Sequence, residues 1–80
     1  MSQTVRVDAE WDPEAAVWVA ESEDVPGLVA EAETLEALTD KLRTLIPELI
    51  DLNDVPVATD DGNLPFDVVA QRHEHTRLPG

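Results

Sequence analysis

The sequence predicts a small α+β domain made of a three-stranded antiparallel meander, one helix and a fourth strand, in the order β-β-β-α-β. Two observations support this prediction. In the first part of the chain apolar residues alternate with polar ones, which is the period of a strand with one buried face. Further along, leucines recur at steps of three and four, which is the period of a helix with one buried face.

The first strand is expected at residues 4–11. The side chains that would share its buried face are Val5, Val7, Ala9 and Trp11. The next residues supply turn chemistry, because Asp12 can accept hydrogen bonds from nearby backbone N–H groups and Pro13 presets φ for a turn. A hairpin with a second strand at residues 16–22 is therefore predicted.

The loop length of this hairpin decides which face of the second strand is buried. A four-residue loop places Trp18 on the valine face of the first strand, whereas one more residue would place Val17 and Val19 there. We expect Trp18 to face inward. The opposite face would still carry apolar side chains, and an exposed apolar sheet face favours contact with a partner.

Pro26 and Gly27 mark the next turn, because a proline disfavours helix in the residue before it and a glycine tolerates positive φ. After this turn the chain has room for one short strand before the periodicity changes. A third strand at residues 28–32 would complete the meander.

One helix is predicted at residues 35–52, where the residues that line one face are Leu35, Leu38, Leu42, Leu45, Ile46 and Leu49. Thr34 is a good N-cap, and Glu36 places negative charge at the positive end of the helix dipole. Pro47 cannot donate to the carbonyl of Arg43, so we expect the helix to kink or break near residue 46.

The last regular segment is expected to be a strand at residues 66–73, after a turn marked by Asp61, Gly62 and Asn63. A chain of 80 residues buries too little surface for two separate cores. We therefore expect one domain at residues 1–76 and a flexible tail at residues 77–80.

The composition restricts the classes of partner. Eighteen Asp and Glu against five Lys and Arg give a net charge of −13, which repels phosphate backbones and argues against direct binding of nucleic acid. There is no cysteine, which excludes disulfides and thiolate metal sites. No signal peptide or membrane span is recognisable, so we expect a cytoplasmic protein with no membrane contact.

Three groups of residues have side chains suited to a chemical site, and none of them predicts an enzyme. His73 and His75 would share one side of a strand, but two ligands do not define a metal site. Asp60, Asp61 and Asn63 lack the remaining ligands of a calcium loop and suit a turn. A third group of acids suits the solvent face of a sheet better than a two-metal centre: Asp8, Glu10, Glu21 and Glu31.

The segment "VPGL", followed by "AETLEAL" at the start of a leucine helix and preceded by an acidic hairpin, resembles the HicB-like antitoxin domain family. The resemblance covers residues 4–52. Two features depart from the family pattern. Ala32 and Glu33 stand where a glycine is usual before the helix cap, and nothing after residue 76 predicts a helix-turn-helix or ribbon-helix-helix.

This resemblance implies a partial ribonuclease-H-like fold without catalytic activity or a cofactor. It also implies a small basic ribonuclease toxin as the partner, neutralised by covering its RNA-binding surface, and assembly as a dimer or larger oligomer. The chain looks similar to the single-domain branch of the family, so direct DNA binding is not expected.

We therefore expect a non-catalytic acidic binding module that occupies a basic site on another protein. The expected partner contacts surround the Pro-Gly turn and the helix start: Asp24, Glu31, Glu33, Glu36 and Asp40. The alternative is a self-assembling structural homodimer of a halophilic type with no toxin partner, in which the acids only keep the surface hydrated. A distant alternative is a metal-dependent nuclease. No catalytic residue, resident metal or cofactor is expected.

Overall fold

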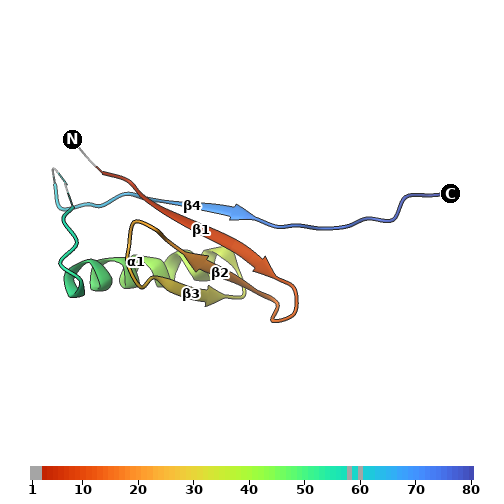
Figure 1. Ribbon diagram of the computed structural model, residues 1–80, viewed down its shortest axis with the longest axis horizontal. Coiled ribbons are helices and arrows are strands. Elements are labelled where there is room, and N and C mark those ends of the chain that lie inside the picture. The colour runs from red at the N-terminus through yellow and green to blue at the C-terminus, as the bar shows by residue number, and fades with distance from the viewer. Residues whose placement is uncertain (1–2, 58, 60) are drawn as a thin grey trace.

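The computed structural model describes residues 3–57, 59 and 61–80. Its elements follow the predicted order, and the α+β class is confirmed (Figure 1). The strands and the helix are β1 (Val5–Asp12), β2 (Val17–Glu21), β3 (Val29–Ala32), α1 (Leu35–Leu52) and β4 (Phe66–Gln71).

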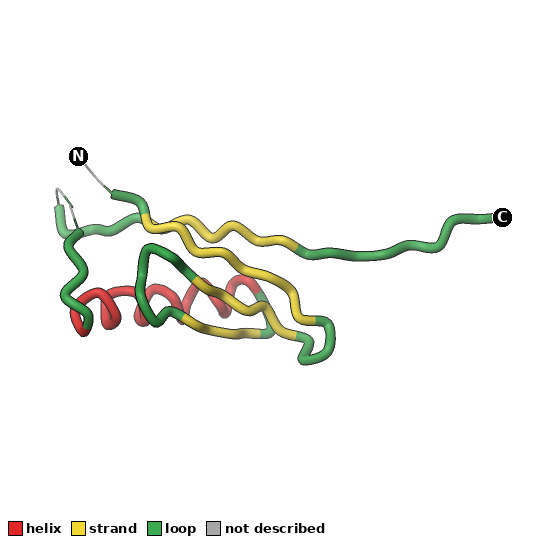
Figure 2. Tube along the Cα trace, in the orientation of Figure 1, coloured by secondary structure: helices red, strands yellow, loops and turns green. Residues whose placement is uncertain are grey.

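The four strands form one mixed sheet in the order β3-β2-β1-β4. β2 is antiparallel to both β1 and β3, whereas β4 lies parallel to β1 at the edge, so the predicted meander is only part of the sheet. The helix packs against one face, chiefly across β2 and β3 (Figure 2). The face toward α1 is termed the inner face and the opposite one the outer face.

Trp18 faces inward, as predicted. Asp12 pairs with Val17 and Trp11 with Trp18, so the hairpin loop has four residues and keeps both tryptophans on the inner face. Their rings meet edge to face with centroids 5.5 Å apart. The Oδ1 atom of Asp12 accepts hydrogen bonds from the N–H groups of Glu14 and Ala15 at 3.0 and 3.3 Å, which is the predicted turn chemistry.

Two side chains of the loop between β2 and β3 form hydrogen bonds with the backbone of β1, beyond the end of the β1–β2 pairing. The β1–β2 pairing ends where Asp8 faces Glu21, which leaves the backbone groups of Arg6 without a strand partner on that side. The Ser22 hydroxyl donates to the carbonyl of Arg6 at 2.6 Å, and the Asp24 carboxylate accepts from the N–H of Arg6 at 2.8 Å. Ser22 and Asp24 therefore satisfy backbone groups that would otherwise need water.

The Pro-Gly turn buries the residues on either side of it. The N–H of Leu28 donates to the carbonyl of Val25 at 3.2 Å, and Gly27 has φ of 81°, the geometry of a type II turn. Val25 and Leu28 are 0% and 3% exposed. The turn thus inserts two apolar side chains into the core.

The helix begins as predicted, because the Thr34 hydroxyl oxygen accepts from the N–H of Ala37 at 3.0 Å. Of the two outcomes expected at Pro47, a kink or a break, the break does not occur, since α1 is one continuous helix from Leu35 to Leu52. Leu42 and Ile46 are buried on one side of the proline, and Leu49 packs against the same core on the other. This packing holds residues on both sides of Pro47 against the sheet, while Pro47 itself is exposed and cannot donate a backbone hydrogen bond to the carbonyl of Arg43.

The fourth strand ends at Gln71 and not at residue 73, because its pairing with β1 stops where Gln71 faces Glu10. Residues 72–80, termed the C-terminal arm, continue away from the sheet (Figure 1), and every one of them is exposed. The arm therefore starts five residues before the predicted tail. Among the described residues, no helix is long and apolar enough to cross a membrane.

Candidate functional site

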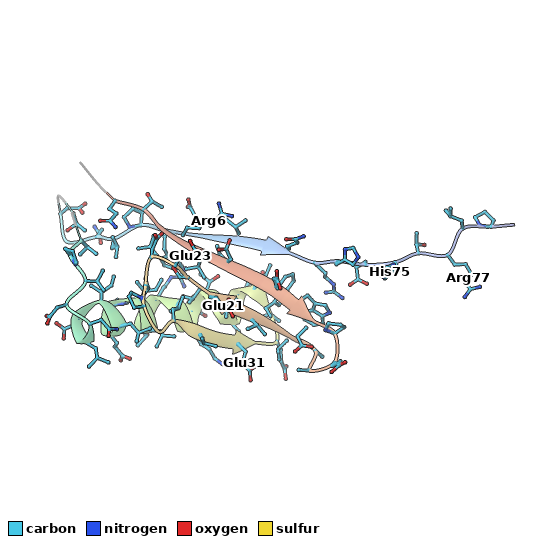
Figure 3. All side chains as sticks on the ribbon, viewed as in Figure 1. Arg6, Glu21, Glu23, Glu31, His75 and Arg77 are labelled. Carbon is cyan, nitrogen blue, oxygen red and sulfur yellow. The ribbon has the colours of Figure 1, made fainter. Side chains whose placement is uncertain are left out.

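The outer face carries a cluster of acidic side chains from three neighbouring strands. Asp8 on β1 stands directly opposite Glu21 on β2. In the next row Glu10 faces Val19, and Val19 faces Glu31 on β3. Figure 3 shows Glu21 and Glu31 on this face. The cluster is termed the outer-face acids and consists of Asp8, Glu10, Glu21 and Glu31.

Little positive charge offsets these carboxylates. The Arg6 Nε group donates to Asp8 at 3.0 Å, and both side chains are at least half exposed. Within the described ranges, none of the ion pairs involves Glu10, Glu21 or Glu31. Carboxylates directly opposite each other on a sheet destabilise it. The outer face would therefore gain stability from an added cation.

Valines share the outer face with the acids. Val29 faces Glu21 on one side of the row, and Val69 faces Asp8 on the other, so one row crosses all four strands. Val29 is 67% and Val69 43% exposed. Exposed apolar side chains rimmed by polar ones are a feature of protein interaction sites, whereas a site for a small cation needs no apolar lining.

The structure separates the five acids that the sequence predicts as partner contacts. Asp24 lies before β3 and Glu33 after it, at opposite ends of that strand. Only Glu31 belongs to the outer face. Glu36 and Asp40 are exposed on the first turns of α1, and Asp40 is paired with Arg43.

The two histidines lie in the C-terminal arm, outside the predicted strand. The ring centroids of His73 and His75 are 5.1 Å apart, and both residues are exposed. Between them the hydrogen bond and charge of Arg72 lower the pKa of the Glu74 carboxyl. In residues 3–57, 59 and 61–80, no group of three or more His, Asp or Glu side chains is placed to hold a metal ion.

The predicted turn at Asp61 is present, since its carboxylate accepts from the N–H of Asn63 at 3.0 Å. That backbone hydrogen bond is the main reason why the pKa of Asp61 is lowered. Asp60, the other carboxylate of this turn sequence, lies outside the described residues.

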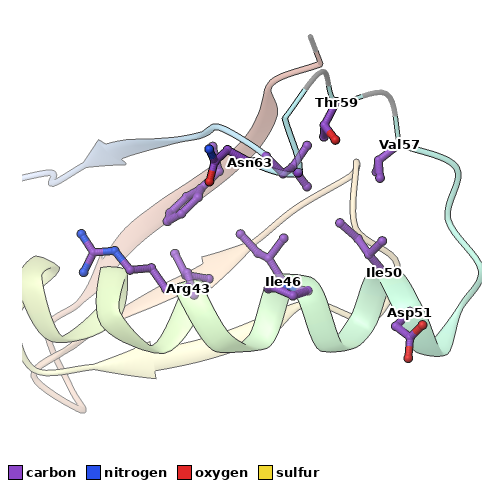
Figure 4. Close-up of a pocket in the computed structure, with 12 residues that line it drawn as sticks. Arg43, Ile46, Ile50, Asp51, Val57, Thr59 and Asn63 are labelled. Carbon is purple, nitrogen blue, oxygen red and sulfur yellow. The ribbon is translucent and has the colours of Figure 1, made fainter.

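A second surface feature is a groove of about 420 Å³ between α1 and the segment that leads into β4 (Figure 4). Its floor is apolar and includes Leu42, Ile46 and Phe66, with Arg43 and Asp51 on the helix beside it. Among the described residues that line it, no cluster of nucleophilic or acid–base groups is present. The groove is suited to an apolar side chain.

The acids that gather on the outer face could be recognised in the sequence as a group, but their arrangement could not. Alternation with valines placed Asp8 and Glu10 on the solvent side of β1. Their opposition to Glu21 and Glu31 depends on strand register, which the hairpin loop and the Pro-Gly turn determine together.

Comparisons with known proteins agree with the fold. A crystal structure of a hypothetical protein, TTHA1013, from the extremely thermophilic bacterium Thermus thermophilus matches with a TM-score of 0.71 and 43% sequence identity, over 95% of this chain and 100% of that one. No curated protein matches. The model of the family described as a domain of unknown function, DUF1902, matches residues 4–78, so the chain belongs to this family.

Proposed function

We propose that this chain is a non-catalytic binding module whose outer-face acids bind a basic surface on a partner protein. The direct opposition of Asp8 and Glu21, on the face that α1 leaves uncovered, carries the proposal. Like charges at opposite positions of a sheet cost stability. A basic partner would replace that repulsion with attraction.

The valines of the outer face support a protein as the partner. Val19 lies between Glu10 and Glu31, and Val69 lies beside Asp8. These valines offer apolar contacts next to the carboxylates of the outer face. The net charge of −13 disfavours a nucleic acid.

The resemblance to the HicB-like antitoxins suggests the class of partner, which is a small basic ribonuclease toxin. Three antiparallel strands before the helix and a fourth strand after it support the partial ribonuclease-H-like arrangement that this resemblance implies. The outer-face acids would cover the RNA-binding surface of the toxin, because that surface is itself adapted to the negative charge of phosphates.

The proposal is tested by expressing the protein together with its native neighbouring genes and identifying by mass spectrometry what co-purifies. A small basic protein in stoichiometric amount is expected. The triple variant Glu10→Lys, Glu21→Lys and Glu31→Lys should then raise the dissociation constant by about tenfold or more, mainly through faster dissociation and weaker steering.

The matched control carries the same charge change away from the outer face: Glu14→Lys, Glu48→Lys and Asp51→Lys. Both triple variants must retain the circular dichroism spectrum of the wild type. If the two raise the dissociation constant equally, binding depends on overall charge and the outer face is not the site.

A third triple variant tests the acids at the helix start: Glu33→Lys, Glu36→Lys and Asp40→Lys. Loss of binding in this variant alone would move the contact to the helix start and contradict the outer-face proposal. A homodimer that co-purifies with no companion, and that unfolds at low salt, would favour the self-assembling alternative instead.

A further inference from the structure

The two edges of the sheet differ in how well they are protected. β3 has four residues, and the ammonium group of Lys41 donates to the carbonyl of Glu31 in that strand. β4 has six residues, pairs only with β1, and contains no Lys, Arg or Pro. Natural sheets protect open edges with short strands, lysines or prolines. The β4 edge is longer than β3 and carries one charged side chain, Asp67, so it is the less protected of the two edges and is available to another strand.

Within residues 3–57, 59 and 61–80, the C-terminal arm interacts with the body of its own chain through its first residue. Arg72 lies over the ring of Trp11, 4.2 Å from the centroid. The rest of the arm continues roughly in the direction of β4 past the β1–β2 hairpin (Figure 1), and the molecule measures 57 Å along its long axis against 24 and 19 Å across it. The pairing of β4 with β1 ends at Gln71, and in the part of the chain that is described no backbone hydrogen bond of a turn or loop involves residues 72–80.

The charge of the arm is opposite to that of the rest of the chain. Residues 72–80 contain two of the five Lys and Arg residues, both histidines and one of the eighteen acids. Arg77 lies near the far end of the arm, away from the body (Figure 3). The positive charge of the arm is complementary to the acidic body of the chain. Because the arm does not fold back onto its own body, this charge can contact the acidic body of another molecule.

We infer that the C-terminal arm binds a second copy of this chain, as an antiparallel strand along the free edge of that copy's β4. A twofold axis at residue 73 places residues 75–80 of each copy beside residues 66–71 of the other. Each arm then covers the whole exposed edge of one β4, and the two sheets join into one of eight strands with both helices on the same side.

The side chains of the arm match this register. Opposite residues of an antiparallel pair share a face, so Leu78 lies beside Val68 on the inner face. Leu78 is 81% exposed in the single chain, and α1 packs chiefly under β2 and β3, which leaves the inner face of β4 only partly covered. Phe66, which precedes Val68 by two residues on the same face of β4, lines the apolar groove, so apolar surface continues from the groove toward this position.

On the outer face the same register sets Arg77 beside Val69. Val69 is the neighbour of Asp8 and lies two residues after Asp67, so the guanidinium comes close to two carboxylates. The arm thereby supplies positive charge at the margin of the outer face and leaves Glu21 and Glu31 free. The dimer and the binding of a basic partner are compatible and independently testable.

Sedimentation equilibrium of the full chain tests the inference. The wild type is expected to be a dimer, and the variant Arg77→Glu with Leu78→Asp should raise the dimer dissociation constant by about tenfold or more, because it removes an apolar contact and reverses a charge. The control is Leu52→Asp, since Leu52 is 77% exposed on α1 and outside the proposed interface. Its dissociation constant should stay within about twofold of the wild type.

A series of single proline substitutions at residues 74–78 tests the strand pairing itself. Every second N–H of an antiparallel strand donates to its neighbour, so the prolines should weaken the dimer at alternate positions and spare those between. These side chains are exposed, and the unfolding transition of the monomer should not change. A monomeric wild type, a dimer that survives the arm variants, or uniform sensitivity to proline would each overturn the inference.

Discussion

The inner and outer faces of the sheet are formed by the same strands but differ in composition: the inner face is apolar and buried, whereas the outer face carries carboxylates. On the inner face Val5, Val7, Ala9, Ala20 and Ala32 are at most 7% exposed, and no polar or charged residue among those described is buried. On the outer face Asp8 and Glu21 face each other. The inner face is explained by folding alone, since its small and branched side chains let α1 approach. The outer face costs stability and therefore points to a requirement outside the fold.

The largest effect that would sharpen this comparison is expected at Leu42, which is 0% exposed on the buried side of α1. Leu42→Ala leaves a cavity between helix and sheet and should lower the free energy of unfolding by about 2–5 kcal/mol. This is a large part of the roughly 4–12 kcal/mol available to a domain of this size. Urea denaturation measures the loss.

The matched control is Leu52→Ala, the same change on the same helix at a position 77% exposed. Its free energy of unfolding should differ from that of the wild type by less than about 0.5 kcal/mol. Comparable losses for the two variants would mean that α1 does not bury the face described above.

An intermediate effect is expected from enlarging neighbouring residues of β2 that point to opposite faces. Ala20 is 0% exposed and lies beneath α1, so Ala20→Leu should cost about 1–3 kcal/mol by overpacking. Val19→Leu adds one methylene on the outer face and should be nearly neutral. Thermal unfolding of both variants provides the comparison, and a neutral Ala20→Leu would show that helix and sheet are not closely packed there.

The smallest effect is expected on the outer face, where Glu21→Gln removes one of two opposed carboxylates. The variant should be more stable than the wild type by a few tenths of a kcal/mol at low ionic strength, and the gain should vanish at high salt. Glu48→Gln on the exposed side of α1 is the control for net charge. A destabilised Glu21→Gln at low salt would contradict the claim that the acids repel one another.

Most of the secondary structure could be predicted because its determinants are local. The Thr34 cap, the turn of Pro26 and Gly27 and the alternation in β1 each depend on a few adjacent residues, and all are present. The inward position of Trp18 also followed from the length of one loop. The strand ends were less certain because pairing partners determine them, as at Gln71.

The partner contacts were harder to predict, because two of the acids expected there bind other groups of the same chain. Asp24 was expected at a partner surface, yet its carboxylate binds the backbone of Arg6. Asp40 pairs with Arg43, and the outer-face acids come together only through the register of three strands. Nothing in the sequence near Asp24 indicated that β1 would need a side chain there.

The sequence by itself determined the order of elements, the two faces of each strand and the acidity of the surface. Only the tertiary structure decided that β4 lies parallel to β1 at an edge, that α1 continues through Pro47, and that the C-terminal arm leaves the body. The physical reason is the sequence separation over which each interaction acts. Periodicity, caps and turns act over a few residues, whereas strand neighbours and an uncovered edge depend on packing between segments far apart in the chain.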